Sequence, residues 1–148
     1  MKLKKLLTQS MISIDLQGTN KEEIIGELLD ILMKTGKVSD RDLAFADLMN
    51  RERQMSTGMQ FGVAIPHAKT KAVKELFACI GVHKTGIEFD AFDEKLSRIF
   101  IMTLSPVDRT GPHVQFLAEI SMVLKSKDAR SKLLQAETAK EALAVFGL

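Results

Sequence analysis

The sequence predicts an α/β fold, a three-layer sandwich whose central mixed β-sheet of about five strands is flanked by helices on both faces. Three observations predict it. Capped, amphipathic segments precede residue 57, nearly continuous apolar runs of strand length occupy the middle of the chain, and helical segments return near residue 112. Strands that are apolar along their whole length are covered on both faces, so helical layers are expected on either side of the sheet.

Two helices are predicted in the first third of the chain. The first follows Asn20, which has Glu23 three residues on in the spacing of a capping box, and it should end near Gly36. Its inward rows are Ile24, Leu28 and Leu32, with Ile25 and Leu29 beside them. The second helix should begin at Ser39 and end before Gly58. It should turn Leu43, Ala46 and Met49 inward.

The middle of the chain should hold a loop at 57–62 and then the strands. Residues 62–66 read as a short apolar strand that Pro66 ends, because proline removes a ladder donor, so His67 is expected just past a strand end. The longer apolar runs predict two buried strands, at 76–82 and 99–104. The polar segments beside them predict two turns, at 84–86 and 93–95.

The last third is predicted to be helical. Pro112 suits a first helical position, which places His113 in the first turn of a helix. The inward face of that helix is predicted from a 3, 4, 3 spacing to be Val114, Leu117, Ser121 and Leu124. Further helices are expected at 129–134 and from Thr138, where Glu141 completes a second capping box.

Composition indicates one globular unit without a strong charge. At 148 residues and 45% hydrophobic, the chain can bury one sizeable core, and we expect a single domain over residues 1–148. The 21 Lys and Arg against 19 Asp and Glu give a net charge of +2, and there is no Trp or Tyr for base stacking. Nucleic acid is therefore not an expected partner.

Cysteine content and hydropathy bear on the compartment. Cys79 is the only cysteine, so no internal disulfide can form, and its apolar surroundings predict a buried structural thiol. The basic start, Met1–Leu7, is interrupted at Thr8 before an apolar stretch of signal-peptide length develops. No apolar run approaches the roughly 18 residues of a membrane span. We expect a cytoplasmic protein with no direct membrane insertion.

Three histidines could carry chemistry. A neutral imidazole is a nucleophile near pH 7, which makes His67, placed after a strand end, an even choice between a functional and a surface residue. His113 gains weight from the helix start, where free N–H groups favour an anion, although a capping role is equally open. His83, beside a predicted turn, is expected at the surface with no role.

Residues 51–58 offer groups that suit a phosphoryl site but also have structural readings. Arg51 lies in a run of mixed charge that commonly forms a solvated helix face, yet its guanidinium could grip two phosphoryl oxygens. Thr57 and Gly58 belong to a turn that could aim backbone N–H groups at a phosphate or simply reverse the chain. No P-loop pattern is present.

Taken together, these segments resemble the active-site signature of the fructose/mannitol class of enzyme IIA in the bacterial phosphotransferase system. The signature is carried by Arg51-Glu52, Ser56-Thr57-Gly58 and the string 62–69 around Pro66-His67, and further likeness by 86–93, 104–106 and His113. The resemblance covers about residues 6–146. Gln60 departs from it, because the family loop commonly has glycine at that position. A glycine that needed positive φ would be replaced here at the cost of slight strain.

The resemblance implies a phosphoryl carrier. His67 would be the phosphorylated nucleophile, and the resemblance suggests Nε2 as the phosphorylated atom. His113 would be a second active-site histidine, and Arg51 would neutralise the phosphoryl charge. Thr57 and Gly58 would position the phosphate. The implied donor is HPr or a nitrogen-branch HPr homologue, and the acceptor is a IIB domain. No cofactor and no metal are implied, since phosphoryl transfer asks mainly for alignment and charge stabilisation.

Other functions stay open at this point. A nitrogen-branch regulatory protein, whose phosphorylation state controls a regulatory target protein without sugar transport, carries the same signature. A metal hydrolase would need His67, His83 and His113 to converge, and the chain has no H-E-x-x-H pair. A serine or cysteine hydrolase is disfavoured because no G-x-S-x-G elbow occurs and the sole cysteine reads as buried.

Overall fold

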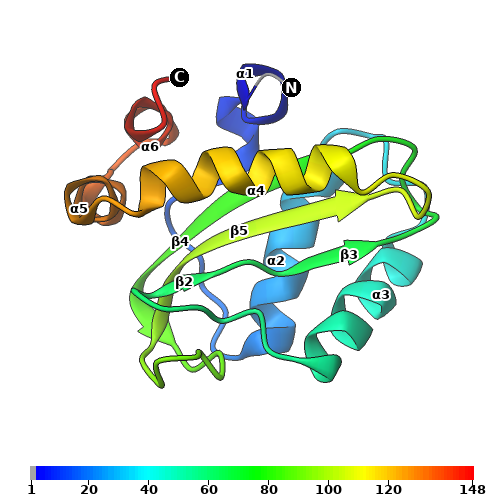
Figure 1. Cartoon of the computed structure of the whole chain (residues 1–148), viewed down its shortest axis with the longest axis horizontal. Helices are drawn as coiled ribbons and strands as arrows, with labels where there is room; N and C mark the ends of the chain where they lie inside the picture. The colour runs from blue at the N-terminus through cyan, green and yellow to red at the C-terminus, as the bar shows by residue number, and fades with distance from the viewer. Residues whose placement is uncertain (1–2) are drawn as a thin grey trace.

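The computed structural model describes residues 3–148, which form one five-stranded sheet with helices packed on it (Figure 1). The strands are β1 (Ile12–Ser13), β2 (Val63–Ala64), β3 (His67–Lys69), β4 (Phe77–Ile87) and β5 (Ser97–Ser105). The helices are α1 (Leu3–Leu6), α2 (Lys21–Met33), α3 (Arg41–Gln54), α4 (Gly111–Leu124), α5 (Lys127–Gln135) and α6 (Ala139–Val145), with a 3₁₀ turn at Gln9–Met11. Met1 and Lys2, which begin the basic N-terminal stretch, lie outside the described residues.

The sheet is mixed, as predicted. Its order is β1-β4-β5-β2, and β3 also pairs with β5. β4 and β5 form a long antiparallel ladder, whereas β1 runs parallel to β4, and β2 and β3 run parallel to β5. Residues 63–69 therefore form one interrupted edge strand, broken at Ile65 and Pro66, where proline has no N–H to donate.

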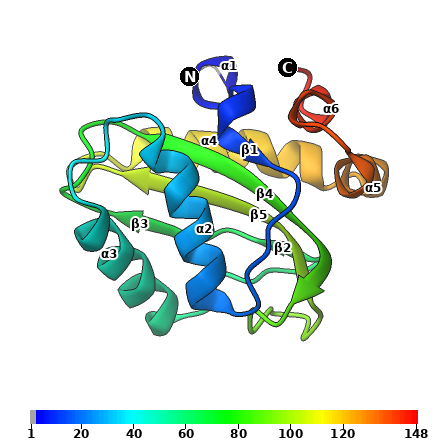
Figure 2. The same ribbon diagram turned by 180° about the vertical axis from the view of Figure 1, so that it is seen from behind.

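Side chains alternate between the two faces of the central strands, and each face packs under its own helices. Phe77, Cys79, Phe100 and Met102 join the core beneath α2 and α3. Ile80, Val82, Ile99 and Ile101 join the core beneath α4, α5 and α6. Figures 1 and 2 show these two helical layers on opposite sides of the sheet. The predicted three-layer sandwich is confirmed.

The first predicted helix forms where its cap places it. Asn20 Oδ1 accepts a hydrogen bond from Glu23 N–H at 2.9 Å, while the Glu23 carboxylate reaches back to Thr19 N–H at 2.8 Å and not to Asn20. The helix ends at Met33, and Gly36 follows in the turn with φ of 70°. A residue without Cβ adopts that conformation at no steric cost.

The second helix was predicted with the wrong start and the wrong face. α3 begins at Arg41 because the side chain of Asp40, not Ser39, caps it by accepting from Leu43 N–H. Leu43 and Ala46 are exposed, and only Met49 of the predicted face is buried. The buried row is instead Ala44, Leu48 and Glu52.

One prediction about the strands was also wrong, and another was incomplete. Residues 84–86 do not form a turn but continue β4 to Ile87, through an irregularity in its pairing with β5 after Val82. His67 does follow the end of β2, but it is also the first residue of a further strand, β3, which was not predicted. The predicted strands at 76–82 and 99–104 and the turn at 93–95 are present.

The predicted inward face of the long helix α4 is right in part. Leu124 is buried and Leu117 packs half-buried against the core, as predicted, but Val114 and Ser121 are exposed, and Phe116 and Ile120 are buried in their place. The helix starts at Gly111, one residue before Pro112. The two last helices form as predicted, and Thr138 caps α6 by accepting from Glu141 N–H at 3.1 Å.

Buried polar side chains beneath α2 include two that sequence analysis weighed. Cys79 is fully buried, as predicted, and its thiol donates to Leu28 O at 3.4 Å. His83 is buried and not at the surface, because Nε2 donates to Gly18 O at 2.9 Å and Nδ1 accepts from Gly86 N–H. Among residues 3–148, no helix combines the length and the apolar composition that a bilayer crossing requires.

Candidate active site

His67 sits on the open edge of the sheet, at the first residue of β3. Its partner across the ladder is Thr103 of β5, and because the neighbouring Ala68 joins the core under α3, His67 faces the α4 side. The imidazole is half-buried, and its Nδ1 lies 2.7 Å from the carbonyl oxygen of Ile65. A carbonyl only accepts, so Nδ1 carries the proton and Nε2 keeps its lone pair.

The surroundings keep this imidazole neutral. Burial lowers the pKa of His67 below its usual value, the Arg51 charge lowers that pKa further, and the Ile65 carbonyl and the Glu52 charge partly oppose the change. The ring is therefore unprotonated at Nε2 near pH 7. Among the described residues, Nε2 has no hydrogen-bond partner within the protein.

His113 is brought next to His67 by α4. It is the third residue of that helix, and the centroids of the two imidazole rings lie 5.0 Å apart with the planes tilted by 35°. Its Nδ1 lies 2.9 Å from the hydroxyl of Thr103. Burial, followed by the charges of His67 and Lys69, lowers the pKa of His113 to about 4. The two histidines singled out from the sequence are therefore adjacent and both neutral.

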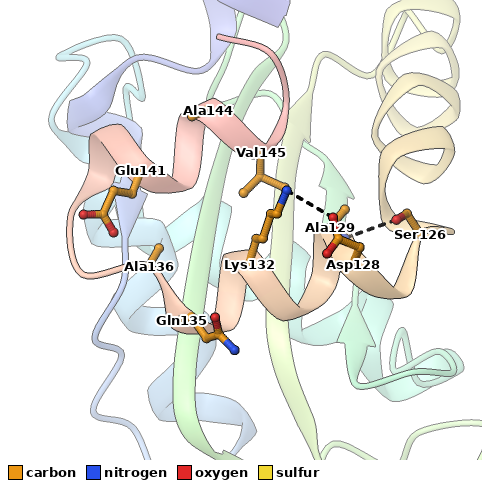
Figure 3. A pocket seen from close by; sticks show the side chains of 9 residues that line it. All are labelled: Ser126, Asp128, Ala129, Lys132, Gln135, Ala136, Glu141, Ala144 and Val145. Atoms are coloured by element: carbon orange, nitrogen blue, oxygen red, sulfur yellow. Dashed lines mark hydrogen bonds and ion pairs between the residues drawn. The ribbon is translucent and has the colours of Figure 1, made fainter.

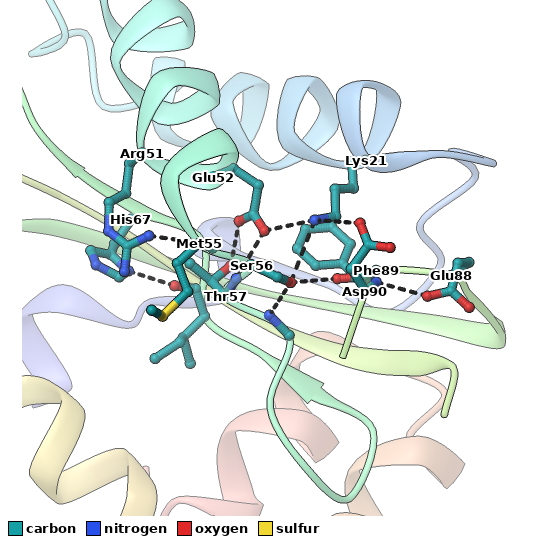
Figure 4. Close-up of polar contacts among 12 residues, drawn as sticks. Lys21, Arg51, Glu52, Met55, Ser56, Thr57, His67, Glu88, Phe89 and Asp90 are labelled. Carbon is teal, nitrogen blue, oxygen red and sulfur yellow. Dashed lines mark hydrogen bonds and ion pairs between the residues drawn. The ribbon is translucent and has the colours of Figure 1, made fainter. Parts of the chain in front are cut away.

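Arg51 reaches the same site from the other helical layer. It lies in the last turn of α3 and donates from Nη1 to Met55 O at 2.8 Å, a carbonyl left free at the helix end. Figure 4 shows its guanidinium beside the His67 ring. A depression of about 360 Å³ lies here, lined by Asp47, Asn50, Arg51, Gln54, His67, Ala68 and Lys69.

Lys69 is a second cation at the site that sequence analysis missed. Residues two apart in a strand share a face, so Lys69 projects on the same side as His67, and that spacing was the available signal. Its ammonium donates to Thr110 Oγ1 at 2.8 Å, at the start of α4. Arg51 and Lys69 both line the depression that contains His67, so an anion bound there would have two cations near it.

Thr57 and Gly58 support the site from behind and do not face His67. Thr57 is buried, and both its N–H and its hydroxyl donate to the Glu52 carboxylate, at 2.8 and 2.5 Å. Gly58 N–H donates to Ser56 Oγ at 3.1 Å. Thr57 O accepts from Ile65 N–H at 3.0 Å, and Ile65 O in turn holds the His67 ring. Thr57 is thus linked to His67 only through Ile65.

Gly58 owes its place to a close approach of two backbones. A Cβ added there would lie 2.8 Å from Phe89 O and from the Cα of Ala91. Any larger residue would push the loop away from the segment after β4. The glycine is thus required by packing of the loop that carries Thr57.

A buried ion pair anchors this loop. The Glu52 side chain is 3% exposed and pairs with Lys21 Nζ at 2.9 Å, and Lys21 also reaches Asp90 at 3.0 Å and lies over the Phe89 ring (Figure 4). The cluster joins the starts and ends of four segments: α2, α3, the 56–58 loop and the segment after β4. The sequence alone suggested no role for Glu52 or Lys21, although Glu52 continues the i, i+4 row of Ala44 and Leu48.

Gln60 does not cause the backbone strain that would arise if its position required positive φ. Positive φ falls on the next residue, Phe61, at 63°, and on Gly62 at 75°, and Gln60 is not among the residues with positive φ. Phe61 is held by a hydrogen bond from its N–H to Asp93 at 3.2 Å and by Arg130, which lies 4.4 Å above its ring. Gln60 therefore does not require the backbone conformation that favours glycine.

A larger hollow of about 510 Å³ lies between α5 and α6, away from the histidines (Figure 3). Its polar side chains serve the helices themselves. Ser126 accepts from Ala129 N–H at 3.2 Å as the α5 cap, and Lys132 pairs with Asp128 at 3.1 Å, one turn away. The hollow holds neither a histidine nor a cysteine, whereas the smaller depression at Arg51 contains His67.

Comparison with known proteins gives a consistent family. The chain is 40% identical over 128 residues to the "PTS system fructose-specific EIIA component" of Haloferax volcanii, covering 86% of this chain and 83% of that one. The nitrogen regulatory protein IIA-Ntr of Neisseria meningitidis superposes with a TM-score of 0.88 and 28% identity, covering 96% and 97%. The IIA mannitol enzyme of Escherichia coli, solved in complex with phosphorylated IIB mannitol, shares the fold at a TM-score of 0.82 and 18% identity over 95% and 96%.

A family model described as "Phosphoenolpyruvate-dependent sugar phosphotransferase system, EIIA 2" matches residues 5–147. That span includes both histidines, Arg51 and every strand of the sheet. This chain therefore belongs to the EIIA type 2 family of the phosphoenolpyruvate-dependent sugar phosphotransferase system.

Proposed function

We propose that this protein is a phosphoryl carrier, in which His67 accepts phosphate from the phosphohistidine of HPr, or of a nitrogen-branch HPr homologue, and passes it to a IIB domain. One observation carries the proposal. The Ile65 carbonyl holds the proton of His67 on Nδ1, so an unprotonated Nε2 stands beside Arg51 and His113. The Escherichia coli IIA mannitol enzyme, which shares this fold, forms a complex with phosphorylated IIB.

The transfer balances without any further reactant. The Nε2 lone pair attacks phosphorus, the P–N bond of the donor's phosphohistidine breaks, and its electron pair stays on the donor imidazole. In the second step the acceptor's nucleophile attacks, and the P–Nε2 bond returns its electrons to His67. The proton stays on Nδ1 throughout, where it is donated to the Ile65 carbonyl. Neither a metal ion nor a nucleotide takes part in this scheme.

The neighbouring groups have distinct roles in the proposal. Arg51 uses one N–H on Met55 O and keeps other donors for phosphoryl oxygens, and Lys69 adds a second positive charge. His113 contacts the phosphoryl group from the α4 side. Thr57 positions the phosphate indirectly, by holding Ile65 and with it the His67 ring, and Gly58 does so by packing the loop that carries Thr57.

Incubation with phosphoenolpyruvate, enzyme I and HPr tests the proposal. Intact mass should show one phosphate that is acid-labile and base-stable. His67→Ala should abolish it, while Arg51→Ala and His113→Ala should fold and transfer about 10² to 10³ more slowly, as for other lost charge-stabilising donors. Arg53→Ala is the matched control, because Arg53 is exposed on the same helix. Labelling of His67→Ala at an unchanged level would refute the assignment.

A nitrogen-branch regulatory role is the second candidate. The likeness to IIA-Ntr of Neisseria meningitidis, with a TM-score of 0.88, supports it, whereas the likeness to a fructose-specific EIIA component supports sugar transport. Transfer from the phosphorylated protein to a fructose-type IIB domain separates the two. Rapid transfer favours transport, and retention of the phosphate together with phosphate-dependent capture of a regulatory protein favours regulation.

A further inference from the structure

The two active-site imidazoles are tied at the same ring atom by partners of opposite kind. Nδ1 of His67 meets the Ile65 carbonyl, which can only accept a hydrogen bond. Nδ1 of His113 meets the Thr103 hydroxyl, which can donate or accept. The direction of the second bond decides which nitrogen of His113 carries its proton.

The surroundings of Thr103 settle that direction. Thr103 is 1% exposed. Among residues 3–148, the only hydrogen-bond partner of its hydroxyl is His113 Nδ1. If Nδ1 carried the proton, the buried hydroxyl hydrogen would have no acceptor, which is unfavourable. The hydroxyl therefore donates to Nδ1, and a neutral His113 carries its proton on Nε2.

We propose that Thr103 is a positioning residue that fixes His113 in the Nε2–H tautomer, opposite to the Nδ1–H tautomer of His67. This rests on the proposed phosphoryl transfer, for which it supplies a division of roles. His67 presents a lone pair to phosphorus, and His113, 5.0 Å away between ring centroids, presents an N–H to a phosphoryl oxygen.

The wrong tautomer would oppose the reaction. With the proton on Nδ1, His113 would turn a lone pair toward an anionic group, and two negative partners repel. In the unphosphorylated protein, burial is the main cause that lowers the pKa of His113 to about 4, so the ring is neutral at pH 7. The tautomer of that neutral ring then decides whether an N–H or a lone pair faces an arriving phosphoryl group.

The sheet register explains how Thr103 comes to do this. Thr103 stands directly across from His67 in the pairing of β3 with β5, and both side chains face α4. His113 enters the same space from the first turn of α4. Thr103 of β5 therefore contacts His113, while the residue paired with it on β3 is His67, the nucleophile.

Nitrogen-15 NMR spectra of the unphosphorylated protein at about pH 7.5 show directly which nitrogen of each imidazole carries the proton. We expect His67 as Nδ1–H and His113 as Nε2–H. In Thr103→Val, which keeps the shape and removes the hydroxyl, His113 should become a mixture of tautomers while His67 stays unchanged. Thr103→Ser should restore the single form.

The kinetic arm uses phosphoryl transfer from phosphorylated HPr. Thr103→Val should slow the transfer by about tenfold, less than the 10² to 10³ expected for deleting the donor itself, and Thr103→Ser should recover most of the rate. Ser97→Ala is the matched control. Ser97 is a buried hydroxyl at the start of the same strand that has no hydrogen-bond partner in the described part of the chain.

The outcomes separate this inference from the proposed function. A wild-type His113 in the Nδ1–H form, or a His113 spectrum unaffected by Thr103→Val, would overturn the tautomer assignment. An altered tautomer with an unchanged transfer rate would overturn the positioning role. If the tautomers are as expected but His67 accepts no phosphate, the proposed function fails and the assignment of the His113 proton stands.

Discussion

Glu52 offers the sharpest test of how the loop behind His67 is held. Its carboxylate bonds to Lys21 and to both donors of Thr57, and the residue is 5% exposed. Glu52→Ala breaks a buried ion pair and leaves two Thr57 donors unpaired. Removing one partner of a buried pair costs about 3–5 kcal/mol, and because Lys21 keeps Asp90 we expect about 3 kcal/mol.

Glu52→Gln separates charge from hydrogen bonding. The amide oxygen can still accept from Thr57 N–H, and the amide nitrogen can donate to Thr57 Oγ1. The variant therefore loses the negative charge that pairs with Lys21 and the acceptor of the Thr57 hydroxyl hydrogen, but it keeps one hydrogen bond to each Thr57 group. We expect a loss of about 1 kcal/mol of unfolding free energy. The loss of its negative charge should also lower the pKa of His67 further, because that charge raises it in the wild type.

Urea unfolding with matched m-values measures these changes. Glu22→Gln is the control, an exposed carboxylate in the first turn of α2, and it should change stability by no more than about 0.5 kcal/mol. If Glu52→Ala costs no more than Glu22→Gln, the buried pair does not hold the loop and the indirect positioning of His67 is wrong.

Three further predictions follow from single contacts. Because the pKa of His113 is lowered from 6.5 to about 4, the unfolded chain binds a proton between these pH values that the folded chain does not bind. The unfolding free energy should therefore fall by about 1–2 kcal/mol as the pH drops from 6.5 to 4. An equal pH dependence of the unfolding free energy in His113→Asn would contradict this. Gly58→Ala should cost about 1–3 kcal/mol through its clash with the backbone of 89–91, whereas Gly111→Ala, in open space, should not; equal melting temperatures would refute the packing argument. Cys79→Ala should cost about 1 kcal/mol without slowing phosphoryl transfer, and reaction of the native thiol with a small reagent would show that Cys79 is not buried.

The fold could be predicted because the central strands carry apolar side chains on both faces. Residues 76–82 and 99–104 are apolar on both alternating sets, which is only stable between two layers. Caps at Asn20 and Thr138 located helix starts within one residue. The extension of β4 through residues 84–86 was not visible, because Lys84 and Gly86 are of types depleted in strands. The strand continues there because β4 pairs with β5 on either side, at Val82 and at Ile87.

The helix faces show why part of the site was missed. In α3 an apolar residue, Leu43, is exposed while a charged one, Glu52, is buried, so a hydrophobicity rule selects the wrong row. The true row passes from Ala44 through Leu48 to Glu52, and the burial of Glu52 depends on Lys21, which is 31 residues away. No local pattern contains that partnership.

A similar error affects part of α4. The predicted face included Val114 and Ser121, which are exposed. The buried face, which runs through Phe116 and Ile120, carries His113 toward Thr103 of the sheet. His67, His113 and Arg51 could be named from sequence, but their convergence depends on the sheet register and on two helices from opposite layers.

The central claim is that His67 Nε2 is the atom that carries the phosphate. Phosphorus-31 and nitrogen-15 spectra of the protein phosphorylated by HPr measure this directly. We predict a single phosphohistidine, with phosphorus on Nε2 of His67 and the proton still on Nδ1. Phosphate on His113, on Nδ1 of His67, or on no histidine at all would contradict the account.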